Sequence, residues 1–186
     1  MRKAARYAGF RVLYALFLPV LLCAAAPAWA GAGVPAGTAG SAAAGPQKLA
    51  LFPFTFSAMA GAKPDPARDE RLASMTAILR DAAAKSRRFA LVPIPDPMQA
   101  PKGSAVSRLF PGCASCAIEA ARELGADVAW IAEVQQVTAI MHSITVTAWD
   151  AKTGRELSES RADVRGDDDA TWKKGVEWLI QNRLFK

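Results

Sequence analysis

The sequence predicts an α/β domain built on a single mixed sheet of five strands, with helices packed on it. Three observations lead to this fold class. Two apolar runs early in the domain are each followed by a helical pattern, which is typical of crossover connections between parallel strands. Three strand-like runs then follow at hairpin spacing, which indicates antiparallel pairing. A closing helical pattern completes the predicted order β-α-β-α-β-β-β-α.

The first half of the domain supplies two strands and the helix between them. Residues 48–56, KLALFPFTF, form an apolar and aromatic run typical of a buried strand. Asp65–Pro66 then provides an N-cap and a proline for the first helical turn. Leu72 and Leu79 recur at helical spacing, so we expect a helix that ends near residues 85–88. Residues 89–94, FALVPI, predict the second strand.

An irregular segment and a second helix follow. Residues 95–112 contain four prolines and predict a long loop, a feature that is often functional in a compact domain. Residues 114–124 have an apolar face at helical spacing, and Gly125 supplies a stop for this helix.

The second half predicts three neighbouring strands and a final helix. The strands are expected at residues 128–138, 141–150 and 156–165. The middle one alternates apolar and polar side chains, which is the pattern of a half-buried strand. The helix is expected at residues 167–184, with three aspartates beside its N-terminal dipole.

The N-terminal residues predict export. Residues 1–30 combine a basic head, a short apolar run and the A-x-A pattern of Ala28 and Ala30, which together are typical of a signal peptide cleaved after Ala30. The apolar run contains Pro19 and is short for a membrane span. Residues 31–47 are rich in Gly and Ala and predict a flexible tether. We therefore expect a single domain at residues 48–186, located in the periplasm.

Charge argues against a nucleic-acid partner. The chain has 23 basic and 17 acidic residues, and four of the basic residues lie in the predicted signal peptide. The remaining 19 against 17 are close to balance, and no basic stripe with interleaved aromatics is left.

Cys113 and Cys116 form a C-x-x-C pair at the start of the second predicted helix. Haem attachment would need a histidine at the position of Ala117, and zinc would need more ligands than the sequence places nearby. Removal of the signal peptide leaves only these two cysteines, and an even number in an oxidising compartment favours a disulfide. We predict a structural disulfide between them, with a redox centre or a metal site as the alternatives.

Catalytic motifs are sparse. His142 is the single histidine, there is no G-x-S-x-G elbow, and no glycine-rich segment opens a helix after a strand. We therefore predict no catalytic, cofactor-binding or metal-binding residues, and a protein that is not an enzyme.

The closing helix carries two apolar stripes. Trp172, Val176 and Leu179 share one face, whereas Trp178 and Phe185, seven residues apart, share another. The second stripe either packs in a groove of the same domain or anchors a partner protein, since aromatic side chains dominate many interfaces. We take Trp178 and Phe185 as candidate partner-binding residues.

Several segments together resemble a known family. LALFPFTF, C-x-x-C before A-x-E-L-G-A-D, WDAKTGRELSESRADVRG and WKKGVEWLIQNRL are similar to a family of uncharacterised proteobacterial exported proteins, over nearly all of residues 48–186. The topology also resembles the N-terminal domain of the Tol translocation protein and the lipoprotein activators of peptidoglycan synthases. Those domains bind proteins and catalyse nothing. Relatives of the family are associated with quinoprotein alcohol dehydrogenase systems, a link that no residue of this sequence carries.

Three functions of different classes are consistent with these patterns. The first is a non-enzymatic periplasmic accessory protein that binds another envelope protein, without a cofactor. The second is a redox or metal-handling accessory that uses the C-x-x-C pair, serving a quinoprotein dehydrogenase system. The third is a small-molecule binder that uses the 95–112 loop, for which the loop's length is the sole indication.

Overall fold

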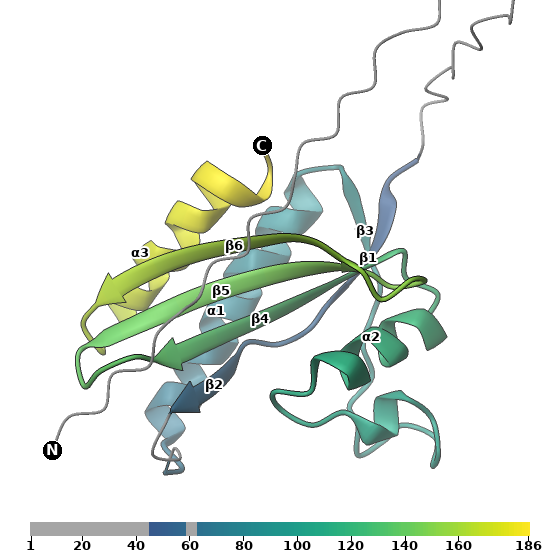
Figure 1. Ribbon diagram of the computed structural model, residues 1–186, viewed down its shortest axis with the longest axis horizontal. Helices are drawn as coiled ribbons and strands as arrows, with labels where there is room; N and C mark the ends of the chain where they lie inside the picture. Colours follow the sequence, from purple (N-terminus) through teal and green to yellow (C-terminus); the bar gives the residue numbers. More distant parts are fainter. Residues whose placement is uncertain (1–44, 59–62) are drawn as a thin grey trace, which may run out of the picture. The chain divides into compact units, whose positions relative to one another are not determined.

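The structure is a computed structural model that describes residues 45–58 and 63–186. Within these residues, a six-stranded mixed sheet forms the centre of the domain (Figure 1). The order β3-β1-β4-β5-β6 is completed by β2, which also pairs with β4. The parallel part joins β1 to β3 and β4, and β2 to β4, whereas β4, β5 and β6 are antiparallel. The predicted α/β class with a mixed sheet is confirmed. The strands are β1 (Gln47–Leu51), β2 (Thr55–Ala58), β3 (Phe89–Leu91), β4 (Val128–Gln136), β5 (Met141–Asp150) and β6 (Glu156–Arg165).

The single strand predicted at residues 48–56 is wrong, because the chain leaves the ladder between β1 and β2. Pro53 has no N–H to donate to a neighbouring strand. Phe52 N still donates to Trp130 O at 3.0 Å, but Phe54 N donates to the Thr76 hydroxyl instead, also at 3.0 Å. The interruption makes two strands of one and raises the predicted number from five to six.

In the described part of the chain, three α-helices pack on the sheet, and their starts follow the capping signals of the sequence. Asp65 caps the first helix by accepting from Ala67 N, and Asp168 caps the third by accepting from Thr171 N. Short turns of 3₁₀ and π geometry complete the helical set. The elements are α1 (Pro66–Lys85), η1 (Val106–Arg108), α2 (Ala114–Glu123), α3 (Asp169–Leu179) and the π turn η2 (Ile180–Leu184).

The helices divide between the two faces of the sheet. In Figure 1, α1 and α3 lie behind the strands, whereas α2 lies apart from them at the lower right. The core under α1 and α3 includes Leu49, Trp130 and Trp172, and a second cluster with Ala50 and Ala129 packs under α2. Within the described ranges, no helix has the length and apolarity needed to cross a bilayer.

The described residues belong to one compact unit, and β1, the first described strand, begins at Gln47. The domain boundary expected at residue 48 stays a prediction. The predicted signal peptide, with Ala28 and Ala30, and residues 31–44 of the predicted tether lie outside the described residues.

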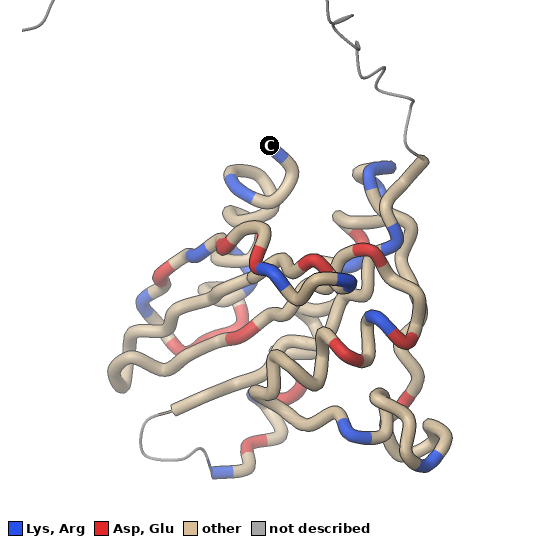
Figure 2. The backbone as a smooth tube through the Cα atoms, turned by 45° about the vertical axis from the view of Figure 1, so that its right-hand side comes forward, with Lys and Arg blue, Asp and Glu red and all other residues tan. Residues whose placement is uncertain are grey.

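Charge is mixed over the described part of the chain. Figure 2 shows basic and acidic segments interspersed along the tube, without a continuous stripe of one sign.

Candidate functional site

A hollow of about 430 Å³ lies between α3 and β6, with Trp178 at its edge. The Trp178 side chain is 43% exposed, whereas Trp172, one and a half turns earlier on α3, is completely buried. Arg183 holds its guanidinium 5.6 Å from the Trp178 ring centroid. A large aromatic side chain is therefore presented to solvent beside a recess.

Gly175 brings α3 close to the sheet at this point. A Cβ atom on Gly175 would stand 2.5 Å from Ile144 Cδ1 and 2.8 Å from Val164 Cγ1. The helix can approach β5 and β6 because this position has no side chain. The close approach forms the floor of the hollow.

The structure separates the two residues of the predicted second stripe. Phe185 is partly buried, and its ring centroid lies 5.7 Å from that of Trp130 and 6.4 Å from that of Phe89. Seven residues of uninterrupted α-helix would place Trp178 and Phe185 on one face, but the π turn Ile180–Leu184 has more residues per turn and rotates Phe185 toward the core. Of the two rings, Trp178 is the more exposed, and the partner-binding role of both residues stays a prediction.

The β6 strand beside the hollow is the last strand of the sheet. Within the described chain its outer edge has no strand partner over its ten residues, Glu156–Arg165. Such an edge presents backbone N–H and C=O groups to any extended segment that approaches.

The walls of the hollow carry a positive excess. Arg161, Arg165 and Lys174 line it together with one acid, Asp163. Arg161 Nε donates to Asp163 Oδ1 at 3.0 Å, and this hydrogen bond holds the pKa of Asp163 below its ordinary value. Asp163 is therefore ionised and already paired, and among the described residues Arg165 and Lys174 have no ion-pair partner.

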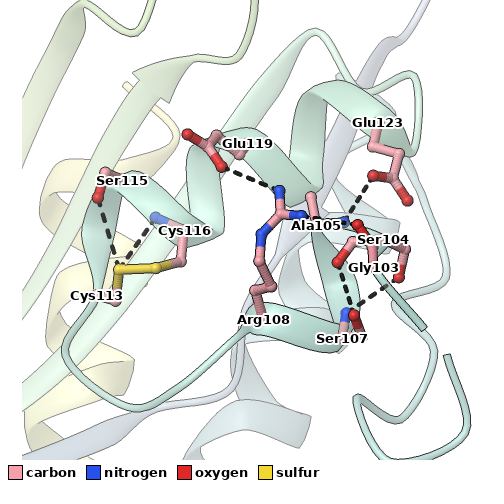
Figure 3. Close-up of polar contacts among 10 residues, drawn as sticks. All are labelled: Gly103, Ser104, Ala105, Ser107, Arg108, Cys113, Ser115, Cys116, Glu119 and Glu123. Atoms are coloured by element: carbon pink, nitrogen blue, oxygen red, sulfur yellow. Dashed lines mark hydrogen bonds and ion pairs between the residues drawn. A yellow bond between two sulfur atoms is a disulfide. The ribbon is translucent and has the colours of Figure 1, made fainter. Parts of the chain in front are cut away.

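Cys113 and Cys116 are joined by a disulfide at the start of α2, with their Cα atoms 5.3 Å apart. Cys113 is also the N-cap residue, because its Sγ accepts from Cys116 N at 3.2 Å. Figure 3 shows the bridge closing the first turn of the helix. The pair therefore ties the end of the 95–112 loop to α2.

Two acidic residues of α2 hold the same loop farther back. Glu123 accepts the backbone N–H of buried Ala105 at 2.7 Å, and Glu119 pairs with Arg108 at 3.4 Å (Figure 3). In the sequence, Glu119 lies three residues before Arg122 and four before Glu123, which is the spacing of ordinary solvated charges on one helix face. The sequence therefore predicted neither contact. The loop is pinned at three places along α2 rather than left free.

His142 lies in the core. Its ring is 1% exposed and lies 5.1 Å from Trp172 and 6.3 Å from Phe56, measured between centroids. Its Nε2 is 3.9 Å from an oxygen of Asp167. Among the residues that the structure describes, no group of three or more His, Cys, Asp and Glu side chains is gathered around a common point that could hold a metal ion.

The fold and the α3–β6 hollow define a small mixed α/β domain with an exposed aromatic surface beside an open sheet edge. The chain belongs to the DUF3280 family, described as "Protein of unknown function (DUF2380)", whose model matches residues 47–184. This agrees with the family resemblance expected from the sequence.

Solved structures with a similar fold come from several bacteria. The LpoB C-terminal domain from Salmonella enterica is 19% identical, with a TM-score of 0.47, over 67% of this chain and 87% of that chain. Lipoprotein GNA1162 from Neisseria meningitidis is 15% identical, with a TM-score of 0.43, over 75% and 99%. TolB from Acinetobacter baumannii is 13% identical, with a TM-score of 0.34, over 74% and 28%.

These similarities are of low sequence identity and carry no information about function. No curated protein matches the chain.

Proposed function

We propose that this protein is a non-enzymatic accessory protein of the bacterial periplasm that binds another envelope protein through the α3–β6 hollow. The observation that carries the proposal is the exposure of Trp178 beside that hollow. A large aromatic side chain exposed to water gains free energy when a partner protein buries it. Tryptophan is also enriched among the residues that dominate binding energy at interfaces. The predicted signal peptide supports the location.

The open edge of β6 supports an extended binding partner. A strand laid along β6 would satisfy backbone groups that the sheet leaves unpaired, while one of its apolar side chains enters the hollow at Trp178. The alternating charges along β6 disfavour its pairing with the edge strands of unrelated proteins. Recognition therefore needs a side chain of the partner that contacts Trp178.

The charge of the surface favours acidic residues on the partner. Arg165 and Lys174 line the hollow, and within the described part of the chain neither forms an ion pair. Charges at the periphery of an interface act mainly on the rate of association. We therefore expect binding to weaken as salt concentration rises, through a slower on-rate.

The test places a photo-crosslinking residue at position 178 of the protein expressed in cells. Crosslinking in cells is compared with the same residue in place of Phe110, an aromatic side chain that is 62% exposed in the 95–112 loop. We expect one exported protein to be crosslinked at position 178 and not at position 110. That protein is then purified and titrated against the wild type, Trp178→Ala and Phe110→Ala.

Trp178→Ala should weaken this interaction by about 30-fold, corresponding to the loss of a hot-spot residue of about 2 kcal/mol. Phe110→Ala should bind like the wild type. The proposal would be wrong if no protein is crosslinked at position 178, or if Trp178→Ala binds as tightly as Phe110→Ala while both are folded.

A further inference from the structure

A cavity of about 530 Å³ is lined by the residues of the β1–β2 break and by residues that follow β3. Its volume is typical of sites for small molecules. Its walls come from the break itself, the 95–112 loop, α2 and β4. Apolar side chains dominate them: Phe52, Phe54, Ile94, Leu109, Phe110 and Ile131.

The topology explains why a cavity forms here. After β1 the chain passes through β2 to α1, whereas after β3 it passes through the 95–112 loop to α2 on the other face of the sheet, so the two connections diverge beyond the ends of β1 and β3. Gaps between diverging connections at the carboxyl ends of parallel strands are common ligand sites. The gap is lined by three prolines, Pro53, Pro95 and Pro111. Because proline has no backbone N–H, these residues cannot donate hydrogen bonds that would join the two segments across the gap.

The wall formed by the loop is held in place. Glu123, Arg108 and the Cys113–Cys116 disulfide fasten the loop to α2, and Cys113 is itself part of the lining. A ligand would therefore enter a preformed cavity and would not have to order the loop on binding.

One cation lines this apolar cavity. Arg80 reaches it from α1, and its Nη2 donates to Leu51 O at 3.2 Å, which uses one of the five guanidinium donors. Every acidic residue of the chain lies within the described ranges, and none is within ion-pair distance of Arg80. Asp96 is the one acid of the lining, and its carboxylate accepts from Met98 N at 2.9 Å.

We infer that this cavity binds a small amphipathic carboxylate, with the carboxylate on the Arg80 guanidinium and the apolar body between Phe52, Ile94 and Ile131. Apolar burial supplies the affinity, and the planar guanidinium selects a carboxylate because it donates two parallel hydrogen bonds to it. The site shares no lining residue with the α3–β6 hollow, so this inference does not depend on the proposed function.

Decanoate and decanol, below micellar concentrations, are the two probes. They share an apolar chain and differ in the charged group. The methyl NMR signals of Ile94 and Ile131 report on the cavity, and that of Ile144, under α3 on the other face, serves as the internal control. We expect decanoate to shift the first two signals saturably, and decanol to do so with about tenfold lower affinity.

Arg80→Gln removes the charge but keeps a donor for Leu51 O. It should weaken decanoate binding by about tenfold and leave decanol binding unchanged. Lys85→Gln, which removes a cation from the same helix outside the cavity, should change neither. Absence of saturable shifts, equal affinity for the two probes, or an equal loss of both in Arg80→Gln would overturn the inference. Trp178→Ala should retain decanoate binding.

Discussion

Arg71 joins the first and last helices of the domain by lying over the Trp172 indole, with its central guanidinium carbon 4.7 Å from the ring centroid. Asp167 and Asp169, at the start of α3, hold the same guanidinium at 2.6 and 2.8 Å. The Arg71 side chain is 12% exposed, so this charge is largely shielded from water. The contact fixes where α3 begins relative to α1.

Replacement of Arg71 by methionine should destabilise the domain by about 1–2 kcal/mol. Methionine keeps an apolar stem but removes the two charged hydrogen bonds and the cation–π contact, while the exposed positions of Asp167 and Asp169 moderate the loss. Urea unfolding measures the change. Arg155→Met, at an exposed arginine of the β5–β6 turn, is the control and should lie within about 0.5 kcal/mol of the wild type.

Phe185→Ala should lower the stability of the domain much more than Trp178→Ala, although both remove an aromatic ring from the same helical segment. Phe185 packs on Phe89 and Trp130, so its loss should lower the free energy of unfolding by about 2–4 kcal/mol. Trp178 is exposed, and its loss should change stability by less than about 1 kcal/mol. Thermal unfolding separates the two, and a large loss in Trp178→Ala would assign that ring to the core.

Local patterns predicted most of the elements because each carries its own signal. Capping residues and hydrophobic spacing placed α1, and alternation placed β5. The break between β1 and β2 also had a signal, since Pro53 interrupts the run, but hydrophobicity outweighed it in the prediction. Pro93 and Pro95 similarly limit β3 to three residues, where six were expected.

The candidate sites were less predictable because they depend on contacts across the chain. The π turn that separates Trp178 from Phe185 has no simple sequence pattern, so an α-helical phase was assumed throughout. Arg80 follows the core residue Leu79 on α1, and nothing near it in sequence shows that it reaches a cavity formed by residues 52–55 and 94–113. Long-range packing decides both cases.

Gly175→Ala should destabilise the domain, although alanine is the better helix former by about 1 kcal/mol. The added Cβ would overlap Ile144 and Val164, and forcing extra volume into a packed site commonly costs about 1–3 kcal/mol. The difference between the two effects is a net loss of up to about 2 kcal/mol in urea unfolding. Lys173→Ala, at an exposed position of α3, is the matched control, and equal stability of the two variants would contradict the close packing.

Asp168 should make stability fall in acid. Hydrogen bonds from the Thr171 hydroxyl and backbone N–H, with Arg71 nearby, lower its pKa in the folded state below 3.8. A carboxyl with a lowered folded pKa stabilises the fold fully above the unfolded pKa, and the contribution disappears as pH falls through the folded pKa. Asp168→Asn should therefore be less stable than the wild type at pH 7, and the difference should shrink toward pH 2. A difference that is constant with pH would exclude this linkage.

The double variant Cys113→Ser and Cys116→Ser should test whether the disulfide acts as a structural crosslink or as a redox centre. The closed ring is small, so the chain-entropy model assigns the bridge about 2 kcal/mol, and the loss should appear in thermal unfolding. Hydrogen exchange should increase near residues 109–113, while Ala105 N stays protected because Glu123 still accepts from it. Mass spectrometry after alkylation of the wild-type protein isolated from cells should find no free thiol at either position, and the wild type should not reduce insulin faster than the variant. Two alkylated cysteines, or turnover above the variant, would instead favour a redox role for the pair.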